Sequence, residues 1–386
     1  MGLRIGIDTG GTFTDLVAVD ENTGRVFTSK RPSTPNKPVS ALISVIRDLQ
    51  KESKEEISIL IHGTTVATNC LLERKGANVL YIGTEGFTDI LFIQRINRKY
   101  NYDLQWVKPK PLVRRINCLG IRERIDHNGK IIIPLEKEET VKFAKQIEIF
   151  VKENDLEAIV ISLINSYVNP VHELHIANLL KKYLPDIPIS ISHEVAPIWR
   201  EYPRASTALA DAYVKPLVGK YIKSLKDGLF KEKIFKDFSI MKSNGGIMQA
   251  DAAPKHPIHT LLSGLAGGLI GGRFFGKKCG YENLLTLDMG GTSADVGMIW
   301  NGELRYTNQF ELDWGIPILT PTLDVHTIGA GGGSIGWLDK GGMLHTGPQS
   351  AGADPGPVCY GNGGNQPTVT DANLILGRLN PNFFHQ

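Results

Sequence analysis

Two segments with the same spacing hold the residues best suited to chemistry. Residues 8–15 read DTGGTFTD and residues 288–295 read DMGGTSAD, so both follow the pattern D-x-G-G-T-x-x-D. Each segment lies between two short runs rich in Ile, Val and Leu, which are typical of β-strands. The pattern predicts two strand-turn-strand units, and its duplication suggests two related domains that face one cleft.

The glycine pair in each turn favours the binding of an anion. Glycine adopts positive φ and has no Cβ, so several backbone N–H groups can converge on a phosphate. A Gly-Gly turn beside an aspartate also occurs in plain hairpins, but two copies favour the phosphate interpretation. The residues predicted to bind phosphate are Thr9, Gly10, Gly11, Thr12, Gly290, Gly291 and Thr292.

Asp8 and Asp288 end the first strands of the two units. A carboxylate there can hold Mg²⁺ through water beside a phosphate, because Mg²⁺ prefers oxygen ligands and keeps several waters. We therefore predict that both are catalytic, as groups that position the metal. For Asp15 and Asp295 we predict that they orient the loops by accepting backbone N–H bonds.

Two further places offer polar groups near strand ends. His62 follows the apolar strand 57–61, an end at which ligands bind in many α/β sheets, and we predict a catalytic role. A histidine that caps or packs locally is the alternative. Asp324 and His326 are two residues apart on the strand 322–327 and share a face, so they form either a substrate or metal pair or a structural ion pair.

The strand 322–327 leads into a stretch of glycines, GAGGGS at residues 329–334. Glycine allows a ligand to approach the backbone closely. We predict that Gly331, Gly332 and Gly333 contact the cofactor, and a flexible turn is the alternative.

The composition fits an ordinary globular protein. The 386 residues suffice for two or three domains, and 41% are hydrophobic and 22% charged. A net charge of +3 is too small to indicate nucleic acid or an anionic membrane surface as a partner. The four cysteines have no metal-binding or redox spacing, and the longest apolar stretch is too short to span a bilayer. We expect a cytoplasmic protein.

Alternating strand and helix patterns predict an α/β fold. We expect an N-terminal α/β domain over residues 1–200, a helical connecting region over 201–283, and the start of a second domain over 284–386. Residues 95–135 mix basic with aromatic side chains and break the alternation. We interpret them as an insertion that covers a cleft or faces a partner chain, in preference to a nucleic-acid contact.

The paired turns resemble the two phosphate loops of the actin, Hsp70 and sugar kinase superfamily. Within it, the sequence is most similar to the A-type subunits of the hydantoinase/oxoprolinase family, which are related to acetone carboxylase β subunits. The resemblance extends over essentially the whole chain, although the family usually has a proline where this chain has Leu265. The motifs that carry it are residues 5–15, 62–69, 201–204, 243–246, 287–296, 326–334 and 350–357.

The resemblance implies duplicated actin-like ATPase domains of the ribonuclease H-like type, with ATP and Mg²⁺ as cofactors. It implies that ATP phosphorylates the carbonyl oxygen of a cyclic amide such as 5-oxoproline or a hydantoin. Water then opens the ring at a partner subunit of B type. Members of the family usually continue with an adenosine-binding motif, so we expect a truncated chain with an incomplete second domain, or a missing half on a separate polypeptide.

An incomplete second domain has a physical consequence. The strand 284–287 is apolar on both faces, so both faces need cover. We expect the chain alone to expose an apolar surface that a partner chain or the missing half covers.

Three other functions stay open. The first is an ATP-dependent carboxylase subunit similar to that of acetone carboxylase. The second is a kinase for a small metabolite, although no clear sugar-kinase motif supplies the carboxylate base that it needs. The third is an inactive remnant or assembly subunit.

Overall fold

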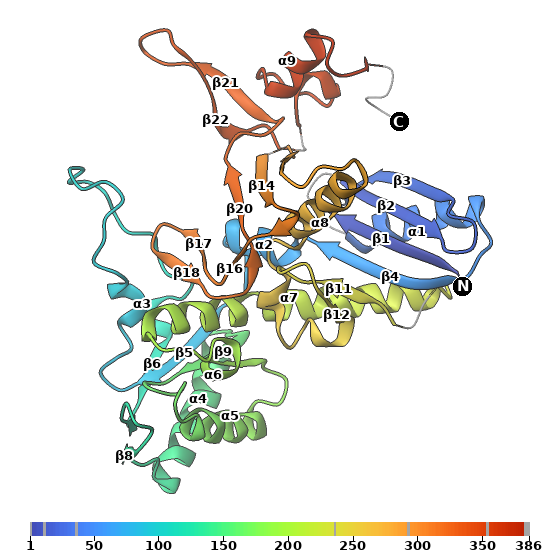
Figure 1. The fold of residues 1–386 in the computed structure, drawn as a ribbon. Helices are drawn as coiled ribbons and strands as arrows, with labels where there is room; N and C mark the ends of the chain where they lie inside the picture. Colours follow the sequence, from blue (N-terminus) through green and yellow to red (C-terminus); the bar gives the residue numbers. More distant parts are fainter. Residues whose placement is uncertain are drawn as a thin grey trace. The chain divides into compact units, whose positions relative to one another are not determined.

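The computed structural model describes residues 2–10, 13–34, 38–234, 237–291, 294–352 and 355–381. The chain forms two compact units, and Figure 1 labels their helices and strands. The first unit comprises residues 1–58, 263–306 and 323–386, and the second comprises residues 59–262 and 307–322. Both units are therefore discontinuous in the sequence. The three consecutive ranges predicted from the sequence group the residues differently and stay a prediction.

The first unit begins with an antiparallel sheet of β1 (Leu3–Thr9), β2 (Phe13–Asp20) and β3 (Val26–Pro32). Alternate residues of β1 point into the core, so Leu3, Ile5 and Ile7 are buried and Asp8 lies on the open face. Helix α1 (Pro38–Glu52) packs against these strands. The first predicted strand-turn-strand unit is confirmed.

A second hairpin in this unit consists of β13 (Leu284–Met289) and β14 (Ala294–Trp300), and β14 also pairs with β15 (Glu303–Leu304) and β20 (Val325–Ile328). Helix α8 (Ser263–Lys278) packs against β13, β14 and β15. Its glycines admit the strand side chains: a Cβ at Gly276 would lie 2.0 Å from Leu284 Cδ1, and one at Gly272 would lie 2.4 Å from Thr286 Cγ2.

One face of β13 is open among the described residues. Leu285, Leu287 and Met289 are 74%, 66% and 50% exposed. The opposite face, with Leu284 and Thr286, meets α8. The expected exposed apolar surface is present in this unit.

The remaining elements of the first unit are the hairpin of β21 (Ser334–Leu338) and β22 (Leu344–Ser350), the turn η4 (Val358–Tyr360) and helix α9 (Val369–Ile375). A capping box of Thr368 and Asp371 starts α9. Gly377 takes a φ of 70° soon after the helix ends. Helix α9 therefore begins after Thr368 and ends at Ile375.

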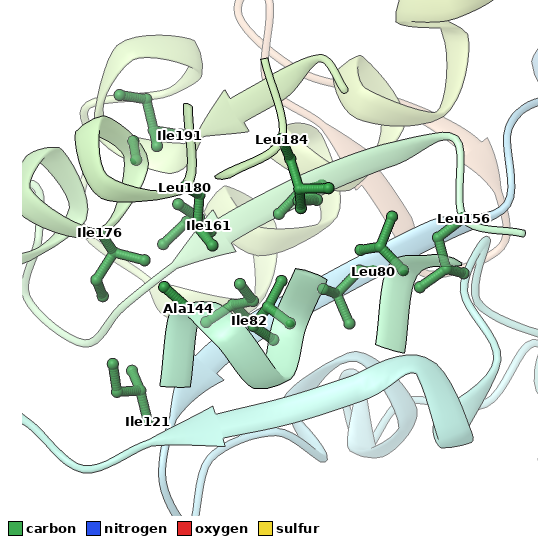
Figure 2. Close-up of a cluster of buried hydrophobic side chains, with 14 of the residues drawn as sticks. Leu80, Ile82, Ile121, Ala144, Leu156, Ile161, Ile176, Leu180, Leu184 and Ile191 are labelled. Atoms are coloured by element: carbon green, nitrogen blue, oxygen red, sulfur yellow. The ribbon is translucent and has the colours of Figure 1, made fainter. Parts of the chain in front are cut away.

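The second unit is built on a parallel sheet in the order β10-β9-β5-β6. Its strands are β5 (Val79–Thr84), β6 (Cys118–Ile121), β9 (Ala158–Ser162) and β10 (Ile189–Ile191). Helices α4 (Lys137–Glu153) and α5 (Val171–Tyr183) contribute Ile147, Ile176 and Leu180 to a core with Leu80 and Ile161 of the strands (Figure 2). β5 and β9 are apolar and buried along their length, as strands of a parallel sheet usually are.

The segment 95–135 is only partly an insertion. Residues 118–121 form β6, which pairs with β5 in parallel and completes the sheet. The basic and aromatic residues lie mainly before this strand, in the long connection from α3 (Ile90–Ile93). The alternation of patterns breaks there because β6 is short and follows a long loop.

Helix α7 (Glu201–Lys231) runs without interruption through Pro216 and begins the region 201–283 that is expected to be helical. β4 (Ile57–Thr64) pairs in parallel with β11 (Ser239–Met241), which pairs with β12 (Ile247–Gln249). The other elements are α2 (Val66–Leu72), η1 (Arg115–Asn117), β7 (Arg124–Ile125), β8 (Ile131–Ile133), α6 (Ser192–Val195), η2 (Ala250–Ala252), η3 (Pro257–Thr260), β16 (Tyr306–Thr307), β17 (Phe310–Asp313), β18 (Ile316–Ile318) and β19 (Thr322–Leu323).

Within the described ranges, no helix is both long and apolar enough to cross a membrane. The cytoplasmic location stays a prediction.

Candidate nucleotide site

The first hairpin arranges three charged side chains in a row across its open face. The register places Asp8 opposite Asp15, and Asp15 opposite Lys30 on β3. Lys30 Nζ donates to Asp15 Oδ1 at 2.7 Å. Side chains opposite one another in adjacent strands lie on the same face, so the row Asp8–Asp15–Lys30 follows from strand pairing.

The second hairpin repeats this row with one change. Asp288 lies opposite Asp295, and Asp295 lies opposite Thr327 on β20. Thr327 Oγ1 donates to Asp295 Oδ1 at 2.6 Å. A neutral hydroxyl therefore stands in the second hairpin where the first has an ammonium group.

The charges of the two hairpins act on each other within the first unit. Asp8 is reached by solvent, but the surrounding protein atoms desolvate it and raise its pKa. The negative charges of Asp15 and Asp288 raise this pKa further, and Lys30 lowers it. Burial and the charge of Asp288 likewise raise the pKa of Asp295, against the hydrogen bond from Thr327. Asp8 and Asp288 are thus brought into one electrostatic environment.

The first turn of α8 borders Asp8. A Cβ at Gly264 would lie 3.5 Å from Asp8 Oδ1. The N-terminus of a helix favours negative charge, because its first N–H groups have no partner inside the helix. Oxygen ligands at Asp8 and Asp288 suit Mg²⁺, which takes most of its remaining ligands from water and phosphate. The donor set therefore fits a hydrated magnesium ion.

The glycines at 331–333 contact the second loop. Gly332 N donates to Gly290 O at 2.8 Å, and Gly333 N donates to Gly291 O at 2.6 Å. A Cβ at Gly333 would lie 2.8 Å from Gly291 O, so the close approach requires glycine. The predicted close contact is present, but its observed partner is protein backbone. A further contact with the cofactor stays a prediction.

His62 is a packed residue of the second unit. It is fully buried, and its Nε2 lies 2.6 Å from the hydroxyl of Tyr221 on α7. This environment matches the alternative of a locally packed histidine, and the catalytic role stays a prediction.

Asp324 and His326 differ in exposure. Asp324 is half-buried, whereas His326 is exposed on β20 opposite Val296. No group of three His, Cys, Asp or Glu residues in the described part of the chain could hold a metal. Metal binding by this pair stays a prediction, and it would require ligands from outside these residues.

Gly11, Thr12 and Thr292 of the predicted phosphate loops lie outside the described residues. Thr9 ends β1 and Gly10 follows it, and Gly290 and Gly291 follow β13. The predicted backbone contacts of Asp15 and Asp295 within the loops also stay predictions. Their interactions described above are with the side chains of Lys30 and Thr327.

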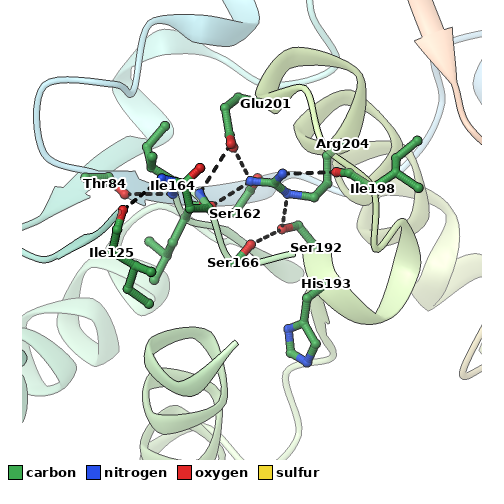
Figure 3. Close-up of polar contacts among 12 residues, drawn as sticks. Thr84, Ile125, Ser162, Ile164, Ser166, Ser192, His193, Ile198, Glu201 and Arg204 are labelled. Carbon is green, nitrogen blue, oxygen red and sulfur yellow. Dashed lines mark hydrogen bonds and ion pairs between the residues drawn. The ribbon is translucent and has the colours of Figure 1, made fainter. Parts of the chain in front are cut away.

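The motif EYPR at residues 201–204 has a structural role in the second unit. The Arg204 side chain is fully buried at the start of α7; its Nη2 donates to Leu163 O at 2.7 Å and its Nε to Ser192 Oγ at 3.1 Å (Figure 3). It also forms an ion pair with Glu201. Burial raises the pKa of Glu201, and the positive charge of Arg204 opposes this rise. The motif therefore ties α7 to the residues that follow β9 and β10.

Sequence reasoning missed Lys30 and Thr327. Lys30 could have been found from the tight turn after β2, where Gly24 N donates to Asp20 O at 2.8 Å, because a short turn determines the register of the strands. Thr327 lies far from Asp295 in the sequence, and no local pattern pairs the two residues.

Two family models match nearly the whole chain. The model of the hydantoinase/oxoprolinase N-terminal region matches residues 4–184, and that of hydantoinase/oxoprolinase matches residues 204–386. An uncharacterized protein of Methanocaldococcus jannaschii is 42% identical, over 98% of this chain and 57% of its own length. The alpha subunit of the caprolactamase of Pseudomonas jessenii is 38% identical, over 97% of this chain and 54% of its own length.

Two solved structures share the fold. A nucleotide-free acetone carboxylase superposes with a TM-score of 0.83 and 29% identity, over 99% of this chain and 56% of its own. The ATP-dependent caprolactamase of Pseudomonas jessenii superposes with a TM-score of 0.78 and 35% identity, over 98% of this chain and 55% of its own length. The predicted α/β fold of the actin-like ATPase type is thereby confirmed. The chain spans about half the length of the curated relatives it matches.

Proposed function

Because this chain belongs to the hydantoinase/oxoprolinase family, we propose that it activates a cyclic amide with ATP as part of a hydrolase of the hydantoinase or 5-oxoprolinase type. The observation that carries the proposal is the pair of aspartate-ended hairpins in one unit, in which Asp288 raises the pKa of Asp8. Two carboxylates that repel one another gain from a cation between them. Mg-ATP would supply that cation and a transferable phosphoryl group.

The residues of the chain would bind and orient the phosphates. Phosphoryl transfer depends mainly on positioning and on neutralising charge. The glycine loops after β1 and β13 would offer backbone N–H groups, the start of α8 would add a favourable dipole, and Asp8 and Asp288 would hold the hydrated metal. Transfer of the terminal phosphoryl group to the amide oxygen, with ADP as the leaving group, would weaken amide resonance and expose the carbon to water.

We assign the hydrolytic step to a partner subunit of B type or to a further part of a longer chain. The caprolactamase relative is named as a subunit, and this chain matches about half of its length. The open apolar face of β13 is a second reason to expect a partner surface.

A carboxylase function is the second candidate. It is favoured by the TM-score of 0.83 to acetone carboxylase, a protein that carries out ATP-dependent acetone carboxylation. Activation of a carbonyl oxygen by phosphorylation would serve both reactions, so the nucleotide site does not separate them.

Turnover of ATP by the chain, co-expressed with a B-type subunit, tests the proposal. We expect 5-oxoproline, hydantoin or caprolactam to stimulate ADP release, and Asp8→Asn or Asp288→Asn to lower it by about 100-fold or more. Asp251→Asn, at an exposed carboxylate of the second unit, is the matched control and should leave turnover unchanged.

Other outcomes would identify the alternatives. Stimulation by acetone with bicarbonate would support the carboxylase, and stimulation by a hydroxyl compound would support a kinase. Absence of ATP turnover with every substrate would support an inactive remnant and contradict the proposal.

A further inference from the structure

Lys30 brings positive charge to a site crowded with carboxylates. It pairs with Asp15, and its charge also acts on Asp8. Asp288 of the second hairpin adds negative charge to the same environment. We propose, on the basis of the proposed function, that Lys30 is a phosphate-binding residue that leaves Asp15 for a phosphate oxygen when nucleotide binds.

The geometry places the ammonium group beside Phe13, at the start of β2. Lys30 Nζ lies 4.6 Å from the centre of the Phe13 ring, and Phe13 is the first residue of β2 after the loop. The β3 backbone is held by continuous pairing with β2 from Phe13 to Val19. The strand is therefore fixed while the long side chain can turn.

The present partner of Lys30 is easily exchanged. The Lys30 and Asp15 side chains are 57% and 46% exposed, and ion pairs at such exposure are weak. A phosphate oxygen offers the same kind of charge-assisted hydrogen bond, and a phosphate group carries more negative charge than a carboxylate. The aromatic ring of Phe13 keeps the cation near the loop in either state.

The second hairpin supports the assignment by contrast. Thr327 stands at the position equivalent to Lys30 and donates its hydroxyl to Asp295 at 2.6 Å. A hydroxyl group is therefore enough to hold this aspartate in place by a hydrogen bond. Holding Asp15 in place does not require the positive charge of Lys30. That charge therefore indicates a negatively charged ligand at the first hairpin.

A purely structural role makes a different prediction. If Lys30 only anchors Asp15, loss of either partner should have the same effect on phosphate binding. If Lys30 binds phosphate, Lys30→Met should weaken binding. Asp15→Asn should leave it unchanged or strengthen it, because it frees the lysine and removes a repelling charge.

Calorimetric titration of the chain with magnesium pyrophosphate tests the assignment. We expect Lys30→Met to raise the Kd by about 10-fold and Lys30→Arg to retain most of the affinity. Lys51→Met is the matched control, because Lys51 is an exposed lysine that pairs with Asp48 at 2.9 Å in the same unit. Unchanged melting temperatures would show that the variants are folded.

The outcomes separate this assignment from the proposed function. Equal affinity of Lys30→Met and wild type, or equal losses in Lys30→Met and Asp15→Asn, overturns the role of Lys30 and leaves the proposed function standing. Absence of pyrophosphate binding by the wild-type chain overturns both.

Discussion

At the scale of single residues, Asp8 shows how a binding site opposes stability. Its pKa is raised above 3.8 by desolvation first, and then by Asp15 and Asp288. An aspartate with a raised pKa binds protons more readily in the folded state than in the unfolded chain. Its contribution to stability is therefore lost as the pH rises from about 3.8 through the folded-state pKa. A metal would need the ionised form of Asp8, and the fold without a metal disfavours that form.

Asp8→Asn is expected to raise the melting temperature at pH 7 by about 2 °C, because it removes the ionised carboxylate from repelling neighbours. The gain should vanish towards pH 3, where wild-type Asp8 is protonated. Calorimetry without nucleotide or Mg²⁺ measures the effect, and Asp251→Asn serves as the control. A lower melting temperature of Asp8→Asn at pH 7 would show that the charge of Asp8 stabilises the fold.

At the scale of elements, the second phosphate loop is supported by a distant segment. The glycines that follow β20 form backbone hydrogen bonds to Gly290 and Gly291, and the segment is held in turn by Thr370 N, which donates to Gly332 O at 2.7 Å. Backbone-to-backbone contact at this distance leaves no room for a side chain. The loop is thus placed by residues that follow it by about 40 positions.

Gly333→Ala tests this support. The new methyl group would lie 2.8 Å from Gly291 O and 2.9 Å from Ser350 Oγ, and a backbone oxygen cannot move away without shifting the loop. We expect a loss of roughly 1–3 kcal/mol in the free energy of unfolding and weaker binding of pyrophosphate. At Gly329 no atom lies within 4 Å of an added Cβ, so Gly329→Ala is the matched control. Equal free energies of unfolding for Gly333→Ala and Gly329→Ala would show that the glycine segment does not support the second loop.

At the scale of the whole molecule, the open face of β13 is the feature that most affects behaviour in solution. Among the described residues, β13 pairs on one side only, with β14, and Leu285, Leu287 and Met289 point away from α8. An edge strand with an apolar face is prone to association. The partner surface proposed above would cover this face.

The chain alone is therefore expected to self-associate, and Leu285→Lys with Leu287→Lys is expected to shift it towards monomer. Sedimentation velocity over a range of concentrations measures the effect. Leu72→Lys, at a leucine of the second unit that is 61% exposed, should have little influence. A wild-type chain that sediments as a monomer at all concentrations would contradict the prediction.

The sequence by itself determined the local features of this protein. The duplicated D-x-G-G-T-x-x-D pattern predicted both hairpins, and the apolar runs around it predicted their strands, because strand periodicity and turn chemistry are local properties. The family followed from the same motifs. Only the tertiary structure decided the rest. Lys30 and Thr327 became neighbours of aspartates through strand register, residues 331–333 met the second loop through long-range hydrogen bonds, and His62 became a buried partner of Tyr221. The tight turn after β2 could have indicated the contact of Lys30. The other contacts join residues far apart in the chain, so no local pattern could determine them.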